Sequence, residues 1–300
     1  MKAVFDQVLV LVLFFFGGWA LCRRGIMHDT QAGALSACVI YFFLPCTMLR
    51  TFALNFTAEY LAAKYPILIV GSVMTVAIVL LSSPLSKRLT GEKYQQAVFE
   101  YLLVCPSYAY IGYELCRSLY GDIALLDLIV FTIPSSVLYT YSVGYCRILK
   151  KPINAKFLLN PTIIAIALGA VIGLTGAALP NAAAILAEKA SACTAPVGMM
   201  TAGAAMARYS FREMLRDKTS YVLVAFRLLI IPAAAYFALR LLGLDEYIRP
   251  AILMLAMPVG TNTVVFPKMI DEECRTSASA LLTSHILCLA TIPLLVSRML

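Results

Sequence analysis

Two prolines, Pro106 and Pro258, each interrupt a long apolar segment of the chain. A proline inside an apolar helix removes one backbone donor and clashes with the preceding turn. In hydrocarbon, the freed backbone groups then need protein, water or a ligand as a partner. An earlier pair, Pro45 and Pro196, lies almost the same distance apart in the sequence. Paired breaks in two halves of an apolar chain indicate a binding site formed by broken helices.

Side chains that can form hydrogen bonds follow both breaks, and they would be costly in lipid unless they faced protein or a water-filled cavity. Each second half-helix also begins at the positive end of its dipole, equivalent to about half a charge. Two such ends facing each other would suit an anion without lysine or arginine in the site. The residues expected to contact this ligand are Pro106, Ser107, Tyr108, Tyr110, Gly112, Pro258, Gly260, Thr261, Asn262 and Thr263.

Two other interpretations of these residues stay open. Unwound carbonyls on the other side of each break could coordinate a cation or orient hydroxyl groups. The polar side chains could also serve only to satisfy the broken backbone.

Four ionisable residues fall within or near apolar segments, where such groups are costly. Glu100 and Arg227 lie close to helix ends, which favours snorkelling to the interface. Glu114 is three residues from Arg117, so a local ion pair is expected. His285 could carry a proton, although a packing role is the simpler interpretation. Roles in ion coupling or in supporting the site are considered for Pro45, Glu114, Asn160, Pro196 and His285.

The elements that position these residues are apolar segments of membrane length. Hydrophobic residues make up 61% of the chain and charged residues 13%, with a mean hydropathy of +0.86. This composition predicts an all-α integral membrane protein. The first apolar segment is followed, not preceded, by basic residues, so we interpret it as a retained helix and not a signal peptide. The ten predicted membrane helices are 4–21, 32–48, 66–82, 97–119, 125–146, 160–174, 182–206, 221–242, 247–268 and 277–300.

The ten segments divide into two sets of five. Residues 1–149 form the first repeat, residues 150–159 a basic cytoplasmic linker, and residues 160–300 the second repeat. Five helices precede the linker, so the second repeat enters the membrane in the opposite sense and the two repeats are inverted. The small residues of segment 192–207 predict a close helix-packing face, which could also be a wall along which a mobile domain slides.

Basic residues gather in alternate loops, which places those loops in the cytoplasm and both termini outside it. The net charge of +8 therefore reflects topology, and we expect no nucleic-acid partner. The nine cysteines show no spacing for a metal site, and we expect neither a metal nor a cofactor. The chain has no phosphate-binding loop for ATP hydrolysis, so an ion gradient or the membrane potential would drive any transport.

Several motifs resemble the auxin efflux carrier family, of the bile acid, arsenite and riboflavin transporter-like superfamily. The most specific is the stretch from Met257 to Val265, and similar motifs are residues 43–45, 160–161 and 282–293. The resemblance implies ten helices in two inverted five-helix repeats, with helices four and nine broken and crossing at the prolines. It also implies a transport domain that moves against a scaffold of helices one, two, six and seven, often in a homodimer. Family substrates are small organic anions, including auxin, malate and malonate.

This sequence departs from the family pattern after the first break. Ser107 stands where asparagine is usual, and Glu114 replaces a second proline. Three tyrosines near the break could stack on an aromatic acid or narrow the pocket for a short one.

The sequence therefore predicts a secondary carrier of small organic carboxylates in the cell membrane, working by an elevator-type alternating access mechanism. It is not expected to be an enzyme. Whether H+ or Na+ is coupled stays open. The alternatives are a sodium-coupled organic anion symporter of the bile acid type and a membrane sensor that keeps the fold but does not transport.

Overall fold

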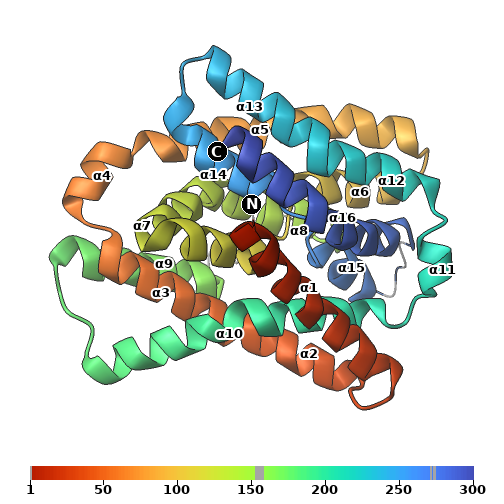
Figure 1. Cartoon of the computed structure of the whole chain (residues 1–300), viewed down its shortest axis with the longest axis horizontal. Coiled ribbons are helices and arrows are strands. Elements are labelled where there is room, and N and C mark those ends of the chain that lie inside the picture. The colour runs from red at the N-terminus through yellow and green to blue at the C-terminus, as the bar shows by residue number, and fades with distance from the viewer. Residues whose placement is uncertain (1, 153–158, 271, 273–274) are drawn as a thin grey trace.

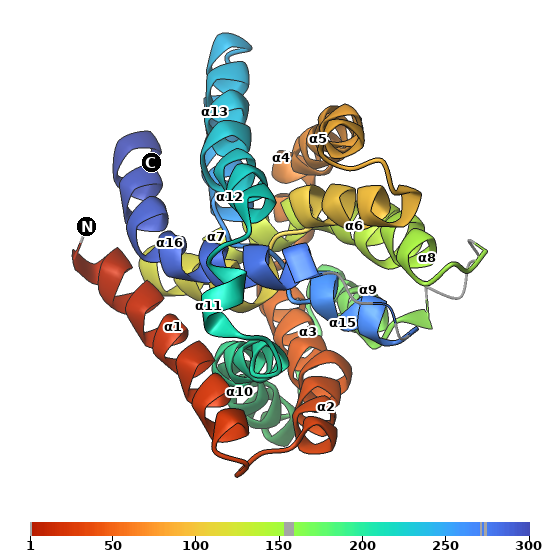
Figure 2. The same cartoon turned by 90° about the vertical axis from the view of Figure 1, so that its right-hand side faces the viewer.

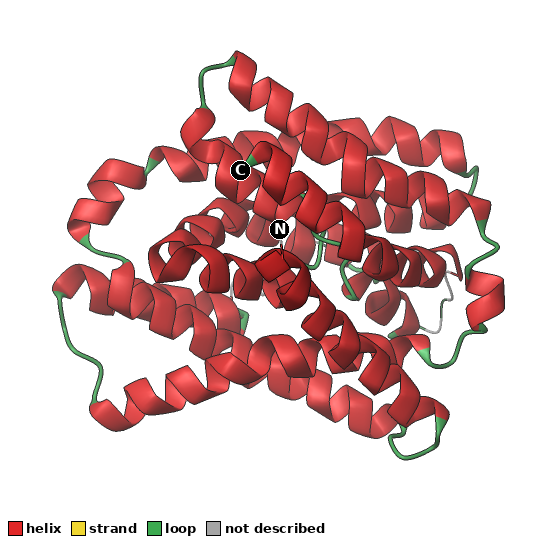
Figure 3. Ribbon diagram, viewed as in Figure 1, coloured by secondary structure: helices red, strands yellow, loops and turns green. Residues whose placement is uncertain are grey.

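The computed structural model describes residues 2–152, 159–270, 272 and 275–300. Most of the predicted linker, residues 153–158, lies outside the described residues, as does Cys274. Within the described ranges the chain is helical and forms no strand (Figure 3). The helices are α1 (Lys2–Arg23), α2 (Asp29–Cys38), η1 (Val39–Phe43), α3 (Leu44–Asn55), α4 (Ala58–Lys64), α5 (Pro66–Leu89), α6 (Lys93–Val104), η2 (Tyr108–Gly112), α7 (Tyr113–Pro134), η3 (Ser135–Val143), α8 (Gly144–Ile148), α9 (Pro161–Thr175), α10 (Asn181–Met206), α11 (Phe211–Met214), α12 (Lys218–Ala225), η5 (Phe226–Ile230), α13 (Ile231–Leu241), η6 (Asp245–Tyr247), α14 (Ile248–Leu255), α15 (Asn262–Lys268) and α16 (Arg275–Met299).

Every apolar segment predicted from the sequence is helical over most of its length, and two of them, 97–119 and 247–268, are interrupted at residues 105–107 and 256–261. Six helical stretches of the described chain are long and apolar enough to cross a membrane: Lys2–Arg23, Asp29–Asn55, Pro66–Leu89, Tyr108–Ile148, Lys218–Leu241 and Arg275–Met299. The prediction of an all-α membrane protein is therefore confirmed.

The longest of these stretches, Tyr108–Ile148, is not one straight rod. Gly121 has φ 84° and ψ −176°, a backbone conformation outside the helical region that glycine adopts at little cost. The chain therefore turns at Gly121, between the helical segment that follows the first break and the next one.

Helices α1 and α10 pack unusually closely. A side chain added at Gly203 would place its Cβ 1.8 Å from the Phe15 carbonyl oxygen, and one at Gly18 would lie 1.9 Å from the Met200 carbonyl oxygen. Small residues on both helices allow this backbone approach. The predicted packing face in residues 192–207 is thus part of an α1–α10 contact, which runs along the lower part of Figure 1.

Ion pairs cluster at the two ends of the helices. At the end of the molecule that carries α11 and α15 (Figure 2), Arg208 and Lys268 both pair with Asp29, and Arg275 pairs with Glu213. The basic residues of these pairs all come from loops that the sequence assigns to one side of the membrane.

The opposite end of the molecule carries its own set of pairs. Arg50 and Arg117 both pair with Asp122, and Lys64 pairs with Glu246. The hydrogen bond to Glu246 raises the pKa of Lys64. The basic residues of these pairs all lie near loops that the sequence assigns to the other side of the membrane. None of these ion pairs joins a basic residue on one side to a partner on the other.

Candidate functional site where two broken helices meet

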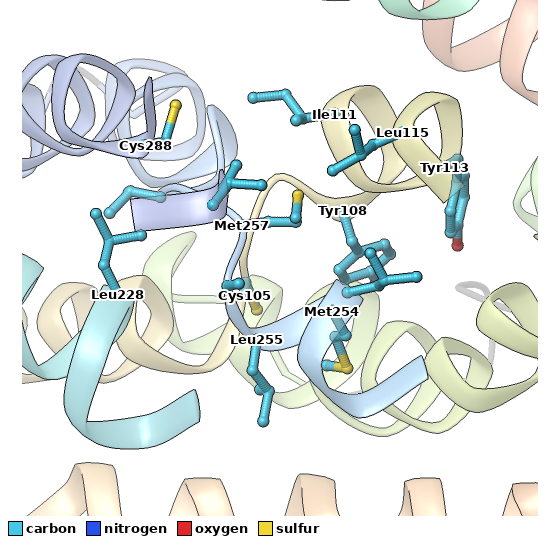
Figure 4. Close-up of a cluster of buried hydrophobic side chains, with 14 of the residues drawn as sticks. Cys105, Tyr108, Ile111, Tyr113, Leu115, Leu228, Met254, Leu255, Met257 and Cys288 are labelled. Atoms are coloured by element: carbon cyan, nitrogen blue, oxygen red, sulfur yellow. The ribbon is translucent and has the colours of Figure 1, made fainter. Parts of the chain in front are cut away.

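The two proline breaks lie side by side. Helix α6 ends at Val104 and α14 ends at Leu255, and an extended segment follows each. Pro106 and Val259 form an isolated antiparallel bridge. The Ser107 N–H donates to the Pro258 carbonyl at 2.8 Å, and the Gly260 N–H donates to the Cys105 carbonyl at 3.1 Å. Figure 4 shows the two extended segments running next to each other, with Cys105 on one and Met257 on the other.

The breaks therefore satisfy much of each other's backbone. The Val259 N–H donates to Ser284 Oγ of α16 at 3.1 Å, and that hydroxyl donates to the Leu281 carbonyl at 3.0 Å. At the first turn of α15, the Thr263 N–H donates to the Gly260 carbonyl, so this amide is bonded within the segment itself. The sequence predicts that the N–H groups at the two helix ends bind an anion. This is wrong for the N–H groups of Ser107, Val259, Gly260 and Thr263, because protein oxygens already accept from them.

A pocket opens beside the paired segments and encloses about 830 Å³, its open mouth included. Its walls come from both breaks, from α7 and η3, and from α3 and α9. Seven of the ten residues expected to contact a ligand line it: Pro106, Ser107, Tyr108, Tyr110, Gly260, Thr261 and Asn262.

The other three expected contact residues do not line the pocket. Gly112 packs against α14, where an added Cβ would meet the Leu253 carbonyl at 3.2 Å. Pro258 supplies the carbonyl that accepts from Ser107. Thr263 is fully buried, and its hydroxyl donates to the Gly260 carbonyl at 2.7 Å. These residues shape the breaks and do not face the cavity.

Besides the hydroxyl of Tyr101, three pocket hydroxyls are buried without a hydrogen-bond partner among the described residues. They are Ser107 Oγ and Thr261 Oγ1, one from each break, and Thr162 Oγ1 from α9. Buried polar groups are rarely left unpaired in proteins, because each costs about 1–3 kcal/mol. Their convergence on one cavity points to a polar ligand or ordered water as the partner.

The sequence interpretation missed one polar wall of the pocket. Thr132, Ser136 and Thr140 line it at intervals of four residues along the end of α7 and the π-helix η3. The Tyr108 hydroxyl lies 2.5 Å from Ser136 Oγ, and Cys105 Sγ lies 3.1 Å from Thr140 Oγ1. This spacing of hydroxyl residues in an apolar helix was the available signal, and π-helical turns often occur at functional sites.

Three residues considered for supporting roles lie outside the pocket lining. Asn160 caps α9, where its side chain accepts from the Thr162 N–H at 2.9 Å, and it thereby positions a pocket residue. Pro45 lies at the start of α3, and Pro196 lies inside α10. These two helices pack together, and Thr47 and Thr194 share a hydrogen bond of 2.9 Å between their hydroxyls.

Glu114 does not form the expected local pair. Arg117 instead pairs with Asp122 at 3.0 Å and reaches Ser191 Oγ at 3.5 Å. Glu114 and Arg117 line a second, smaller pocket with Ser191 and residues of α3 and α10.

His285 is enclosed by packing contacts. Its ring is fully buried and stacks on Phe15, with centroids 4.9 Å apart and an interplanar angle of 15°. Its Nδ1 lies 2.7 Å from the Leu281 carbonyl, which places the proton on Nδ1. The ring does not line either pocket.

Snorkelling is the wrong interpretation for Glu100 and Arg227. Glu100 is 3% exposed and binds Arg147 and the Tyr139 hydroxyl. Arg227 is 0% exposed and donates to backbone carbonyls in the core. Both side chains point inward because the protein offers them partners there.

Comparison with protein-family models finds one family, described as membrane transport protein, that matches the chain twice, over residues 3–157 and 145–296. None of the curated proteins compared with the chain matches it.

Proposed function

This chain belongs to the auxin efflux carrier family of membrane transport proteins, and on that premise we propose that it carries small organic anions across the cell membrane. The observation that carries the proposal is that the hydroxyls of Ser107, Thr261 and Thr162 surround one pocket at the two breaks and have no hydrogen-bond partner in the described part of the chain. A carboxylate accepts from such donors without needing a cation in the pocket.

In this proposal the helical elements make ten membrane crossings. Broken crossing four consists of α6, η2 and the part of α7 before Gly121, and broken crossing nine consists of α14 and α15. The remaining crossings are α1; α2 with η1 and α3; α5; the rest of α7 with η3 and α8; α9; α10; α12 with η5 and α13; and α16. The proposal groups these crossings into two inverted five-helix repeats, each with one helix broken at a proline, Pro106 or Pro258.

The pocket lies between elements that could move relative to each other. The breaks, α7 and η3 form one side, and Leu44 and Met48 of α3 with Thr162 of α9 form the other. An anion bound to the first side would travel with the broken helices while α1, α3, α9 and α10 stay fixed. This arrangement favours an elevator-type alternating access mechanism.

The Tyr110 ring contacts α10 at Gly198, where an added Cβ would lie 2.7 Å from it. In an elevator mechanism Tyr110 would slide along α10 here, because Gly198 has no side chain to block the ring.

The membrane potential can drive this transport alone. Moving one elementary charge across 100 mV is worth about 2.3 kcal/mol, which suffices to export an anion. We place the termini outside the cytoplasm, since the more basic loops lie at the opposite end. A homodimer in the bilayer completes the proposal.

Flux into proteoliposomes tests the proposal. Purified protein is reconstituted, and uptake of labelled malate, malonate and indole-3-acetate is measured under an imposed potential, with and without sodium and a pH gradient. Uptake of at least one of these acids above that of empty liposomes is expected. A strict sodium requirement would favour the symporter alternative, and binding without flux would favour the sensor.

A further inference from the structure

Arg227 is the largest fully buried side chain of the described chain. It lies on η5, a π-helical segment between α12 and α13. Its Nη1 donates to the Leu103 carbonyl at 3.1 Å, and its Nη2 donates to the Met254 carbonyl at 3.4 Å. One guanidinium thus links the ends of α6 and α14, the two half-helices that precede the breaks.

Both carbonyls lack their ordinary helical partners because of the breaks. The Met254 carbonyl would accept from residue 258, but Pro258 has no N–H. The Leu103 carbonyl would accept from the Ser107 N–H, which instead donates to the Pro258 carbonyl. Arg227 supplies the two missing donors.

The position also attracts positive charge. The last turns of α6 and α14 are the negative ends of two helix dipoles, where a cation is stabilised. Arg227 forms no ion pair with a carboxylate among the residues that the structure describes. A buried charge without a charged partner is costly, so the two carbonyl ends must balance it.

The guanidinium is also close to the pocket. Its acceptor Leu103 lies two residues before Cys105, which lines the pocket. An anion in the pocket would therefore feel this fixed positive charge through a protein interior of low dielectric constant.

We propose that Arg227 is a tethered cation, occupying the place between the carbonyl ends of two broken helices where a sodium-coupled carrier would hold its ion. In broken-helix transporters such carbonyl ends coordinate the coupling cation. Here the cation is covalently attached and moves with the helices, so anion transport needs no sodium. This last consequence rests on the proposed carrier function, whereas the cation site does not.

Removal of the side chain tests the site directly. Arg227→Ala leaves two carbonyls facing a cavity, so low millimolar methylguanidinium or sodium should raise the melting temperature of this variant by about 2–4 °C. The wild type should not respond. Leu228→Ala is the matched control, because Leu228 is the adjacent buried residue and its removal leaves an apolar cavity. Equal responses of the two variants to these cations would overturn the proposal.

A second measurement holds even if Arg227→Ala does not fold. Replacing sodium by N-methylglucamine should leave wild-type flux unchanged, and Arg227→Lys, which keeps a positive charge, should retain stability better than Arg227→Met. A sodium requirement in the wild type, or a methionine variant as stable as the lysine variant, would refute the tethered cation. Absence of all flux would instead refute the carrier function, and the melting experiment would still decide the cation site.

Discussion

The N–H of Ser107 donates to the carbonyl of Pro258 over 2.8 Å, so the residue after one proline is bound to the other proline. A return bond from the Gly260 N–H to the Cys105 carbonyl completes the pair. Each broken helix therefore supplies some of the backbone partners that the other has lost. The hydroxyls of Ser107 and Thr261 form no hydrogen bond to the described backbone, and both residues line the pocket. Their hydroxyls are therefore available to a ligand.

Ser284→Ala should destabilise the protein, because the buried Val259 N–H would lose its acceptor. An unsatisfied buried donor costs about 1–3 kcal/mol. Thermal unfolding in detergent measures the loss. Ser82→Ala is the control, since the Ser82 hydroxyl is equally buried but donates only to the Ile78 carbonyl of its own helix. Equal stability of the two variants would contradict an anchoring role for Ser284.

Gly18→Ala should disrupt the contact between α1 and α10, whereas Gly17→Ala should not. The added Cβ at Gly18 would lie 1.9 Å from the Met200 carbonyl oxygen, and nothing lies within 4 Å of one at Gly17. In a rigid interior such overlap costs about 1–3 kcal/mol or more. Melting temperatures of the neighbouring variants give the comparison, and a Gly18 variant as stable as the Gly17 variant would show that the helices are not so closely packed.

His285→Gln should leave the pH dependence of flux unchanged. The imidazole stacks on Phe15 and lies beside the Leu281 carbonyl, away from both pockets. Flux is measured from pH 5 to 8 in liposomes, the range in which an ordinary histidine titrates. A shifted or flattened profile would assign His285 a part in proton coupling.

Single cysteines at Lys93 and Asn181 should react with a membrane-impermeant thiol reagent from opposite sides of the membrane. Both positions are exposed at helix ends, at the start of α6 and of α10. The charge distribution predicts that Lys93 is cytoplasmic and Asn181 external. Labelling of intact cells on a cysteine-free background checks this, and labelling at Lys93 without permeabilisation would reverse the orientation.

The sequence predicted the breaks well, because a proline inside an apolar helix acts locally and its effect follows from its position in the segment. It also identified Ser107, which directly follows Pro106, and Thr261 and Asn262, which lie within four residues of Pro258. The sequence could not predict the role of Arg227, because the two carbonyls that accept from it, those of Leu103 and Met254, are distant from it in the chain. Nothing near Arg227 in sequence indicates that two distant helix ends converge on it.

The hydroxyl wall of Thr132, Ser136 and Thr140 was missed for another reason. Serine and threonine inside an apolar helix often bond to their own backbone, as Thr132 does with the Ile129 carbonyl. Their spacing alone does not distinguish that use from a wall of a pocket. Only the fold shows that Thr132, Ser136 and Thr140 line the pocket, because it places these residues opposite the breaks.

The most direct test of the account is anion uptake by the double variant Ser107→Ala/Thr261→Val, which removes one pocket hydroxyl from each break. A hydrogen bond to a charged group contributes about 1.5–3 kcal/mol, so the concentration of acid needed for half-maximal uptake should rise at least about tenfold. Ser72→Ala, whose hydroxyl bonds to its own helix outside the pocket, should behave as wild type. Undiminished affinity in a folded double variant would contradict an anion site between the broken helices.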